Sequence, residues 1–143
     1  MAASRRSTAF AGLALAALLL SGCSSSSSAA SAQTTEQACD VLASGVEATT
    51  TRLQASLSGL ATDPETAADD VTTLTSDFEK SAAGVDNVEV KNLATEAIAA
   101  LSDFDEKIHA YADDPADVDV RAAVQTSAEG VQDAIGAIGV TCP

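Results

Sequence analysis

The residues best suited to chemistry in this chain are a single histidine, three cysteines and a short acidic cluster. His109 is the only histidine among the 143 residues. It follows Glu106 at the Glu-x-x-His spacing with which helical bundles hold two iron ions. Such a centre needs that pair on two helices, and this chain has no second histidine. The apolar periodicity also points Glu106 outward, so we expect a solvated helix face here and no metal centre.

Four aspartates crowd one turn, at positions 113, 114, 117 and 119. Asp113, Asp117 and Asp119 are the candidate ligands for Ca²⁺, because calcium prefers several carboxylate oxygens. The EF-hand spacing, with its central glycine and distal glutamate, is absent. Negative charge at the start of a helix is stabilising by itself. We therefore interpret the cluster as a helix start and expect no bound metal.

Catalytic arrangements are not evident in the sequence. Nucleophilic catalysis needs a nucleophile, a base and an orienting group, and His109 is the only histidine that could act as the base. No Gly-x-Ser-x-Gly elbow and no phosphate-binding glycine loop occurs. With 21 acidic residues, paired carboxylates are expected by chance, and there are too few aromatic residues for a sugar platform. We expect a protein that is not an enzyme and holds no cofactor.

The N-terminus has the layout of an export signal. Arg5 and Arg6 supply positive charge, and residues 8–20 form an almost wholly apolar run of Ala, Leu and Phe. As a helix this run would rise only about 20 Å, against roughly 30 Å of bilayer hydrocarbon. It is therefore too short for a permanent membrane span, and we interpret it as a transient export segment.

Leu20, Ser21, Gly22 and Cys23 follow directly, and this motif resembles the lipobox of bacterial lipoproteins. The resemblance covers only the first 23 residues. It implies that residues 1–22 are cleaved and that the Cys23 thiol carries a diacylglyceryl group, often with a third acyl chain such as palmitate on the new amine. Two chains suffice for stable anchoring, so the resemblance implies a protein held on the extracytoplasmic face of the cell membrane.

Cleavage at this site would deepen the negative charge. The full chain has 7 basic and 21 acidic residues, a net charge of −14. Without Arg5 and Arg6, five basic residues face 21 acidic ones, a net of −16. This balance argues against binding to DNA, RNA or anionic lipid through phosphates. A cationic partner, a bound metal or simple solubility remain open.

A serine-rich tether is expected between the lipid and the folded domain. Residues 24–31 are all Ser and Ala, so we expect residues 23–33 to be flexible. Once Cys23 is assigned to lipid, Cys39 and Cys142 are the two remaining cysteines. Disulfides persist outside the cytoplasm, so we expect one bridge between them.

Apolar residues recur at steps of three and four in four stretches of residues 34–143, the pattern of amphipathic helices. Thr34 and Gln37 have a capping-box spacing, which predicts a first helix over about 35–61. Asp63 followed by Pro64 predicts the start of a second helix. The expected inward residues of these two helices are Ala38, Leu42, Gly45, Thr49, Leu53, Leu57, Leu60, Ala67, Val71, Leu74, Phe78, Ala82 and Val85.

Asp86 and Glu89 repeat the capping-box spacing and predict the start of a third helix. Asp114 and Pro115 repeat the Asp-Pro start and predict a fourth, which we expect to end at Gly139. The expected inward residues of this pair are Val90, Leu93, Ala97, Leu101, Phe104, Ile108, Tyr111, Val120, Val124, Ala128, Val131, Ile135 and Ile138, with Ile98 at the flank.

Four helices joined by short turns predict an all-α, antiparallel, up-down-up-down four-helix bundle over residues 34–143. This topology brings the start of the first helix and the end of the fourth to one end, where Cys39 and Cys142 can pair. The core residues are mostly small, which lets helices approach closely and favours a filled bundle over one with a large pocket.

Two functions compete. The first is a lipid-anchored binding or structural module for a protein or cell-envelope partner, acting through an acidic face or a helix groove. The acidic turn at 113–119, at the end away from the tether, is the first place to look for that partner. The alternative is a carrier of a small apolar ligand, lipid or haem, between the helical hairpins. His109 and Tyr111 are its candidate ligand residues, although side chains two apart on a helix point in different directions.

Overall fold

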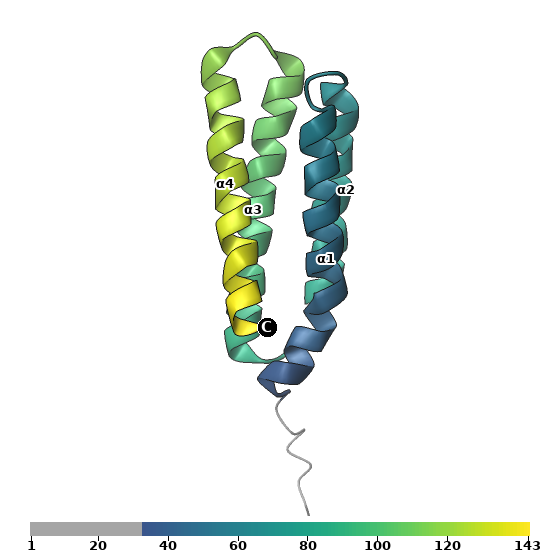
Figure 1. Cartoon of the computed structure of the whole chain (residues 1–143), viewed down its shortest axis with the longest axis vertical. Helices are drawn as coiled ribbons and strands as arrows, with labels where there is room; N and C mark the ends of the chain where they lie inside the picture. The colour runs from purple at the N-terminus through teal and green to yellow at the C-terminus, as the bar shows by residue number, and fades with distance from the viewer. Residues whose placement is uncertain (1–32) are drawn as a thin grey trace, which may run out of the picture.

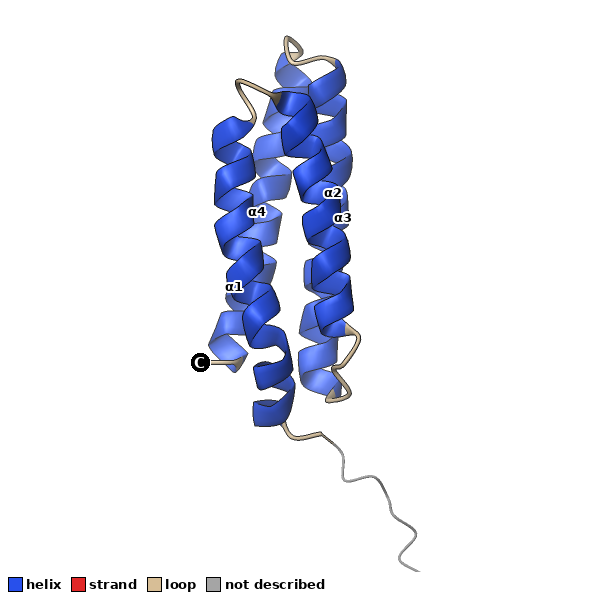
Figure 2. Cartoon of the chain, turned by 90° about the vertical axis from the view of Figure 1, so that its right-hand side faces the viewer, coloured by secondary structure: helices blue, strands red, loops and turns tan. Residues whose placement is uncertain are grey.

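The computed structural model describes residues 33–143, which form four α-helices (Figure 1). These are α1 (Thr35–Gly59), α2 (Pro64–Ala82), α3 (Val88–Asp113) and α4 (Val118–Thr141). Loops connect them, and residues 33–143 contain no strand (Figure 2). The signal peptide, Cys23 and most of the serine-rich tether fall on residues 1–32, outside the described residues. Across the described helices, no segment is apolar enough over a sufficient length to span a bilayer.

Consecutive helices run antiparallel, so the up-down-up-down bundle is confirmed. The turns that follow α1 and α3 lie together at one end of the molecule (Figure 1). The start of α1, the turn between α2 and α3, and the end of α4 lie at the other end. We call this second end the disulfide end, because Cys39 and Cys142 are bonded there.

The first two helix starts agree with the sequence. The Thr34 hydroxyl accepts from the Gln37 backbone N–H at 3.2 Å, and the Gln37 side chain accepts from the Thr34 N–H at 3.0 Å. These bonds make the predicted capping box. Asp63 caps α2 by accepting from the Thr66 N–H at 3.1 Å, and Pro64 occupies the first turn. Local side-chain chemistry fixes both starts.

The predicted start of the third helix at Asp86 is wrong, because Asn87 caps α3 instead. The Asn87 side chain accepts from the backbone N–H groups of Glu89 and Val90. Gln33 holds the turn before α3, because its side-chain oxygen accepts from the N–H of Asp86 at 2.7 Å and from the N–H of Asn87 at 3.1 Å. Gln33 was expected at the end of the tether, but it packs on the turn between α2 and α3.

The predicted Asp114-Pro115 start of the fourth helix is also wrong. Asp114 follows the last residue of α3, and its side chain accepts from the Ala116 N–H within a tight turn. Asp117 caps α4 by accepting from the N–H groups of Asp119 and Val120. Gly139 does not end α4, which continues to Thr141, where the Cys142 N–H still donates to the Ile138 carbonyl.

The core lies between consecutive helices and contains Phe78 and Phe104, the two largest fully buried side chains. Most predicted inward positions are confirmed as buried. Some are only half-buried, and four of these face the space between α1 and α4. The half-buried ones are Leu57, Leu60, Ala82, Leu93, Tyr111, Val120 and Ile135.

The seam between α1 and α4 differs from the other three. Helix α1 packs closely on α2, α2 on α3, and α3 on α4, whereas α1 and α4 make hardly any close backbone approach. The expectation of a filled bundle therefore holds for three seams and is wrong for the fourth. The backbones of α1 and α4 therefore stay apart except near the disulfide, and side chains between them such as Leu57 and Ile135 are only half-buried.

Candidate functional site

Three depressions lie in a row along the seam between α1 and α4, and together we call them the groove. Their volumes are about 300 Å³ at the disulfide end, 360 Å³ in the middle and 440 Å³ at the far end. All three are open to solvent along one side. The far depression also reaches α3 through Tyr111. Each of the three is larger than the depressions of about 100 and 160 Å³ that lie elsewhere on residues 33–143.

The disulfide closes one end of the groove. Cys39 and Cys142 are bonded, with their Cα atoms 5.3 Å apart, and both residues line the first depression. The predicted pairing is therefore confirmed. Leu42, Val46 and Ile138 supply the apolar surface beside the bond. The bond holds α1 against α4 where interhelical packing is sparse.

The middle depression has an apolar floor and one unpartnered polar atom. Leu53, Val131 and Ile135 form most of that floor. Thr49 also lines it, and its buried hydroxyl has no hydrogen-bond partner. Helical threonines usually satisfy this group by donating to the carbonyl four residues earlier, as Thr50 does to Val46 at 3.0 Å. A buried hydroxyl without a partner costs about 1–3 kcal/mol, so the α1 side of the groove is not optimised for stability.

The far depression combines apolar and polar groups. Leu57, Leu60 and Val124 line it together with the half-buried ring of Tyr111. Arg121 stands at its end, and the guanidinium donates to the Pro115 carbonyl at 3.0 Å. The arginine is therefore partly engaged by the turn that precedes α4.

Helix α4 presents bare backbone to the groove. Gly136 lines the middle depression and Gly139 the first. A Cβ built on either residue would meet no other heavy atom within 4 Å. Glycine inside a helix costs about 0.5–1 kcal/mol relative to alanine, and no contact within this chain accounts for it here.

The rim of the groove is mainly acidic and amide-bearing. Asp40 and Glu47 stand on the α1 side of the first depression, and Glu129 lines the far depression from α4. Gln54 and Gln132 flank the middle. An apolar floor between acidic edges is suited to an amphipathic, positively charged partner.

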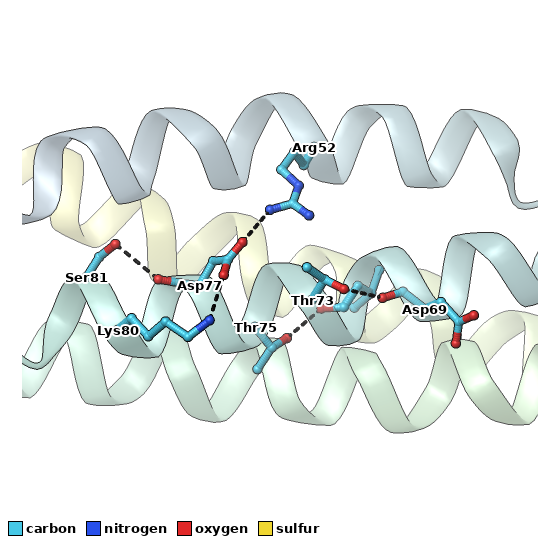
Figure 3. Close-up of polar contacts among 8 residues, drawn as sticks. Arg52, Asp69, Thr73, Thr75, Asp77, Lys80 and Ser81 are labelled. Atoms are coloured by element: carbon cyan, nitrogen blue, oxygen red, sulfur yellow. Dashed lines mark hydrogen bonds and ion pairs between the residues drawn. The ribbon is translucent and has the colours of Figure 1, made fainter.

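A separate ion-pair network joins α1 to α2 on another face (Figure 3). Asp77 on α2 contacts Lys80 at 3.0 Å and Arg52 of α1 at 2.8 Å. Hydrogen bonds from Lys80 and then Arg52 lower the pKa of the Asp77 carboxyl below its usual range. Its contribution to folding is therefore present above the ordinary carboxyl pKa and lost as the pH falls through the lowered value. All three side chains are largely solvated, so we assign them a structural role.

The candidate haem ligands do not share a cavity. Tyr111 lines the groove, whereas His109 faces α2, where its Nε2 lies 3.0 Å from the Thr72 hydroxyl. That hydroxyl donates to Asp105 at 2.8 Å. His109 and Asp105 therefore bridge α3 to α2 on a partly solvated surface. Glu106 is exposed, as its position in the helix predicted.

Two aspartates of the acidic turn accept hydrogen bonds from the backbone. Asp117 accepts backbone N–H groups at the start of α4, and Asp114 does so within the turn. Asp113 ends α3, and Asp119 lies in the first turn of α4. In residues 33–143, no group of three or more His, Cys, Asp or Glu side chains is placed to hold a metal ion.

Sequence reasoning missed the groove itself, although it identified several of its residues as inward. A signal was present in α4, where Gly136 and Gly139 interrupt a helix that needs neither as a terminus. Gln125 and Gln132, spaced two turns apart, face the groove with them. Polar and glycine positions beside an apolar stripe are consistent with a helix face that is left uncovered.

Comparisons with known protein families, with curated proteins and with solved structures found no match to this chain. The groove and its chemistry therefore carry the functional interpretation.

Proposed function

We propose that this protein is a lipid-anchored, extracytoplasmic binding module that receives a protein or cell-envelope partner in the groove between α1 and α4. The observation that carries the proposal is the open seam, with its apolar floor and three depressions in line. Leu53 and Val131 are buried beneath the middle depression, but Leu57, Leu60 and Ile135 are only half-buried, so part of the apolar lining stays accessible. The lipid anchor rests on the resemblance of Leu20–Cys23 to a lipobox.

The position of Gln33 supports an orientation for the anchored protein. Its side chain forms hydrogen bonds with the turn between α2 and α3, so the chain enters the domain at the disulfide end. Gln33 is ten positions after Cys23, a stretch that reaches at most about 36 Å. The groove then starts near the membrane and runs away from it, which leaves its middle and far depressions open to a partner.

Binding fits the lining better than catalysis does. The groove residues are apolar side chains, amides, acids, one arginine, Tyr111 and two threonines, one of them with its hydroxyl donated to the Val46 carbonyl. His109, the single histidine, lies outside the groove and shares a hydrogen bond with the Thr72 hydroxyl. A nucleophile next to a base, which acyl or phosphoryl transfer would need, is not among the lining residues.

Site-specific photo-crosslinking tests the groove. A photoreactive amino acid replaces Gly136 in the full-length chain, expressed in the cells from which the sequence comes, and a matched variant carries it at Gly130. Both glycines are exposed on α4 and have open space around the Cβ, but only Gly136 lines the groove. We expect one discrete adduct from position 136 and none from position 130. Equal labelling from both positions, or none from either, would contradict the proposal.

The anchor is tested separately at Cys23. The Cys23→Ala variant should carry no acyl chain, either as a precursor that keeps residues 1–22 or as a released chain, and intact-mass measurement distinguishes both from an acylated protein. A Ser24→Ala variant controls for the substitution itself. An acyl chain still present on Cys23→Ala, or absent from the unchanged protein, would refute the lipid anchor and leave the groove proposal standing.

The second candidate function, a carrier of a small apolar ligand, is favoured by the volumes of the two larger depressions, about 360 and 440 Å³. Native mass spectrometry of the folded domain with a lipid extract or with haem would detect it as a discrete added mass. An unchanged mass in both mixtures would dismiss the carrier. The separation of His109 from Tyr111 already argues against haem held by that pair.

A further inference from the structure

We propose that the groove binds one helix of a partner protein, an amphipathic helix with an apolar stripe and positively charged flanks. This inference rests on the proposed function and specifies the chemistry of the partner. Four observations favour it: the spacing of the depressions, the bare backbone of α4, the charge of the rim, and the opening of the groove to solvent along its length.

The spacing of the depressions matches a helix. Along α4, the sets of residues that line the three depressions follow one another at intervals of about seven residues, which is about 10.5 Å of helix rise. Apolar side chains at i, i+7 and i+14 of an incoming helix are separated by the same distance and lie on one face. One helix of about 20 residues can therefore place an anchor side chain in each depression.

The glycines allow this helix to come close. Gly136 and Gly139 expose α4 backbone beside the middle and first depressions, with open space where a side chain would stand. Close approach between helices requires small residues at the contact. Gly130 of α4 is equally open but lies outside the groove, so what favours a helix here is the position of Gly136 and Gly139 beside two of the depressions. Thr49, whose buried hydroxyl has no hydrogen-bond partner, lies in the opposite wall of the middle depression.

The acidic side chains at the rim of the groove favour a positively charged partner. Asp40 and Glu47 border the first depression and Glu129 the far one, while Arg121 is partly engaged by the Pro115 carbonyl. Lysines or arginines on both flanks of an incoming helix would meet these acids. A second copy of this chain is a poor occupant, because residues 33–143 carry five basic and 21 acidic residues and would bring acid against acid.

The open side of the groove argues against a lipid chain as the occupant. An acyl chain is apolar all round and gains most from an enclosed cavity, whereas each depression here faces water on one side. An amphipathic helix has one apolar face to bury and one polar face for the solvent. The geometry of the groove therefore fits the helix better.

The test uses a fluorescein-labelled peptide of 22 residues with Leu at the a and d positions of three heptads and Lys at the flanking e and g positions. Its matched control has Glu in place of every flanking Lys. Binding to the folded domain, residues 33–143 with the disulfide intact, is followed by fluorescence anisotropy at 150 mM salt. We expect saturable 1:1 binding of the Lys peptide and an affinity at least 30-fold lower for the Glu peptide.

Two pairs of variants locate the binding. Gly136→Leu should weaken the Lys peptide at least tenfold by filling the middle depression, whereas Gly130→Leu should change its affinity less than twofold. Neither added side chain meets a neighbour at its Cβ, so both variants should fold, as circular dichroism can verify. Glu47→Lys should weaken binding at least fivefold, and Glu96→Lys, an equal charge change on the exposed surface of α3, less than twofold.

The proposal is overturned if neither peptide binds, if the Lys and Glu peptides bind equally, or if the Gly136 and Gly130 variants behave alike. Displacement of the bound peptide by palmitate, together with stoichiometric palmitate binding that Gly136→Leu abolishes, would assign the groove to a lipid chain instead. A discrete crosslink from position 136 in cells alongside failure of the peptide would leave the groove as the binding site and refute only its helical, cationic occupant.

Discussion

The seam between α2 and α3 and the seam between α1 and α4 belong to the same bundle but are built differently. Helices α2 and α3 pack closely, and each contributes a fully buried phenylalanine to the core, Phe78 and Phe104. Between α1 and α4, Thr49 is buried without a partner, and Gly136 and Gly139 contribute no side chain. Small and polar residues therefore occur where the bundle is least closely packed, and large aromatic side chains contribute to the packed core.

A covalent bond takes the place of packing in the open seam. Cys39 and Cys142 fix α1 to α4 at one end, closing a loop whose ends are 103 residues apart. The other three seams are joined directly by short turns, and each is packed along its length. This arrangement keeps α1 and α4 together while leaving the surface between them available.

The largest expected effect comes from truncating the packed region. Phe104→Ala should destabilise the domain by about 3–5 kcal/mol, because it leaves a cavity in a fully buried site. Leu57→Ala in the open seam should cost less than about 1.5 kcal/mol, since this side chain is already half-exposed. Urea unfolding followed by circular dichroism measures both changes. Equal losses would mean that the two seams are equally packed in solution.

Removing the disulfide should have the next largest effect. The Cys39→Ala, Cys142→Ala double variant should lose about 2–4 kcal/mol of unfolding free energy, with a chain-entropy limit near 4.7 kcal/mol for a loop of about 100 residues. Amide exchange should rise most in the first turns of α1 and the last turns of α4. Titration of the unreduced domain should find no free thiol, and two free thiols there would disprove the bond.

Alanine at two glycines should change stability in opposite directions. Gly45 lies in the packed seam between α1 and α2, where an added Cβ would stand 2.9 Å from the Cβ of Ser81. Gly45→Ala should therefore destabilise the domain by about 1–3 kcal/mol. Gly136→Ala should stabilise by about 0.5–1 kcal/mol, because alanine favours the helix and meets nothing. Thermal unfolding of the two variants measures whether each change in stability is positive or negative. A destabilised Gly136→Ala would show that α1 and α4 are closer in solution.

The smallest effect concerns the unpartnered hydroxyl. Thr49→Val keeps the side-chain shape and removes a buried group that has no hydrogen bond, so it should stabilise by about 1 kcal/mol. Thr75→Val is the matched control, because the Thr75 hydroxyl donates to the Val71 carbonyl at 3.0 Å and its loss should not stabilise. Chemical unfolding of both variants tests this difference. If Thr49→Val destabilises, the hydroxyl has a partner in solution.

Local signals predicted two of the four helix starts. Thr34 and Asp63 cap their helices as expected, since each bonds a backbone N–H three residues on. Asp86 has equally suitable chemistry, but Asn87 caps α3, in a turn where the N–H groups of Asp86 and Asn87 donate to the distant Gln33 side chain. Asp114 likewise accepts from Ala116 within a turn and leaves the α4 cap to Asp117.

The sequence by itself determined the four amphipathic helices, their antiparallel order and the partner of Cys39. Periodicity and short turns are local properties of the chain, and an even number of antiparallel helices brings the start of the first and the end of the last to the same end. Only the tertiary structure decided that α1 and α4 stay apart and that a groove lies between them. Closure of the last seam depends on how well two sets of side chains, some 80 residues apart in sequence, fill one space. No local pattern specifies that fit, because it is a property of the assembled bundle.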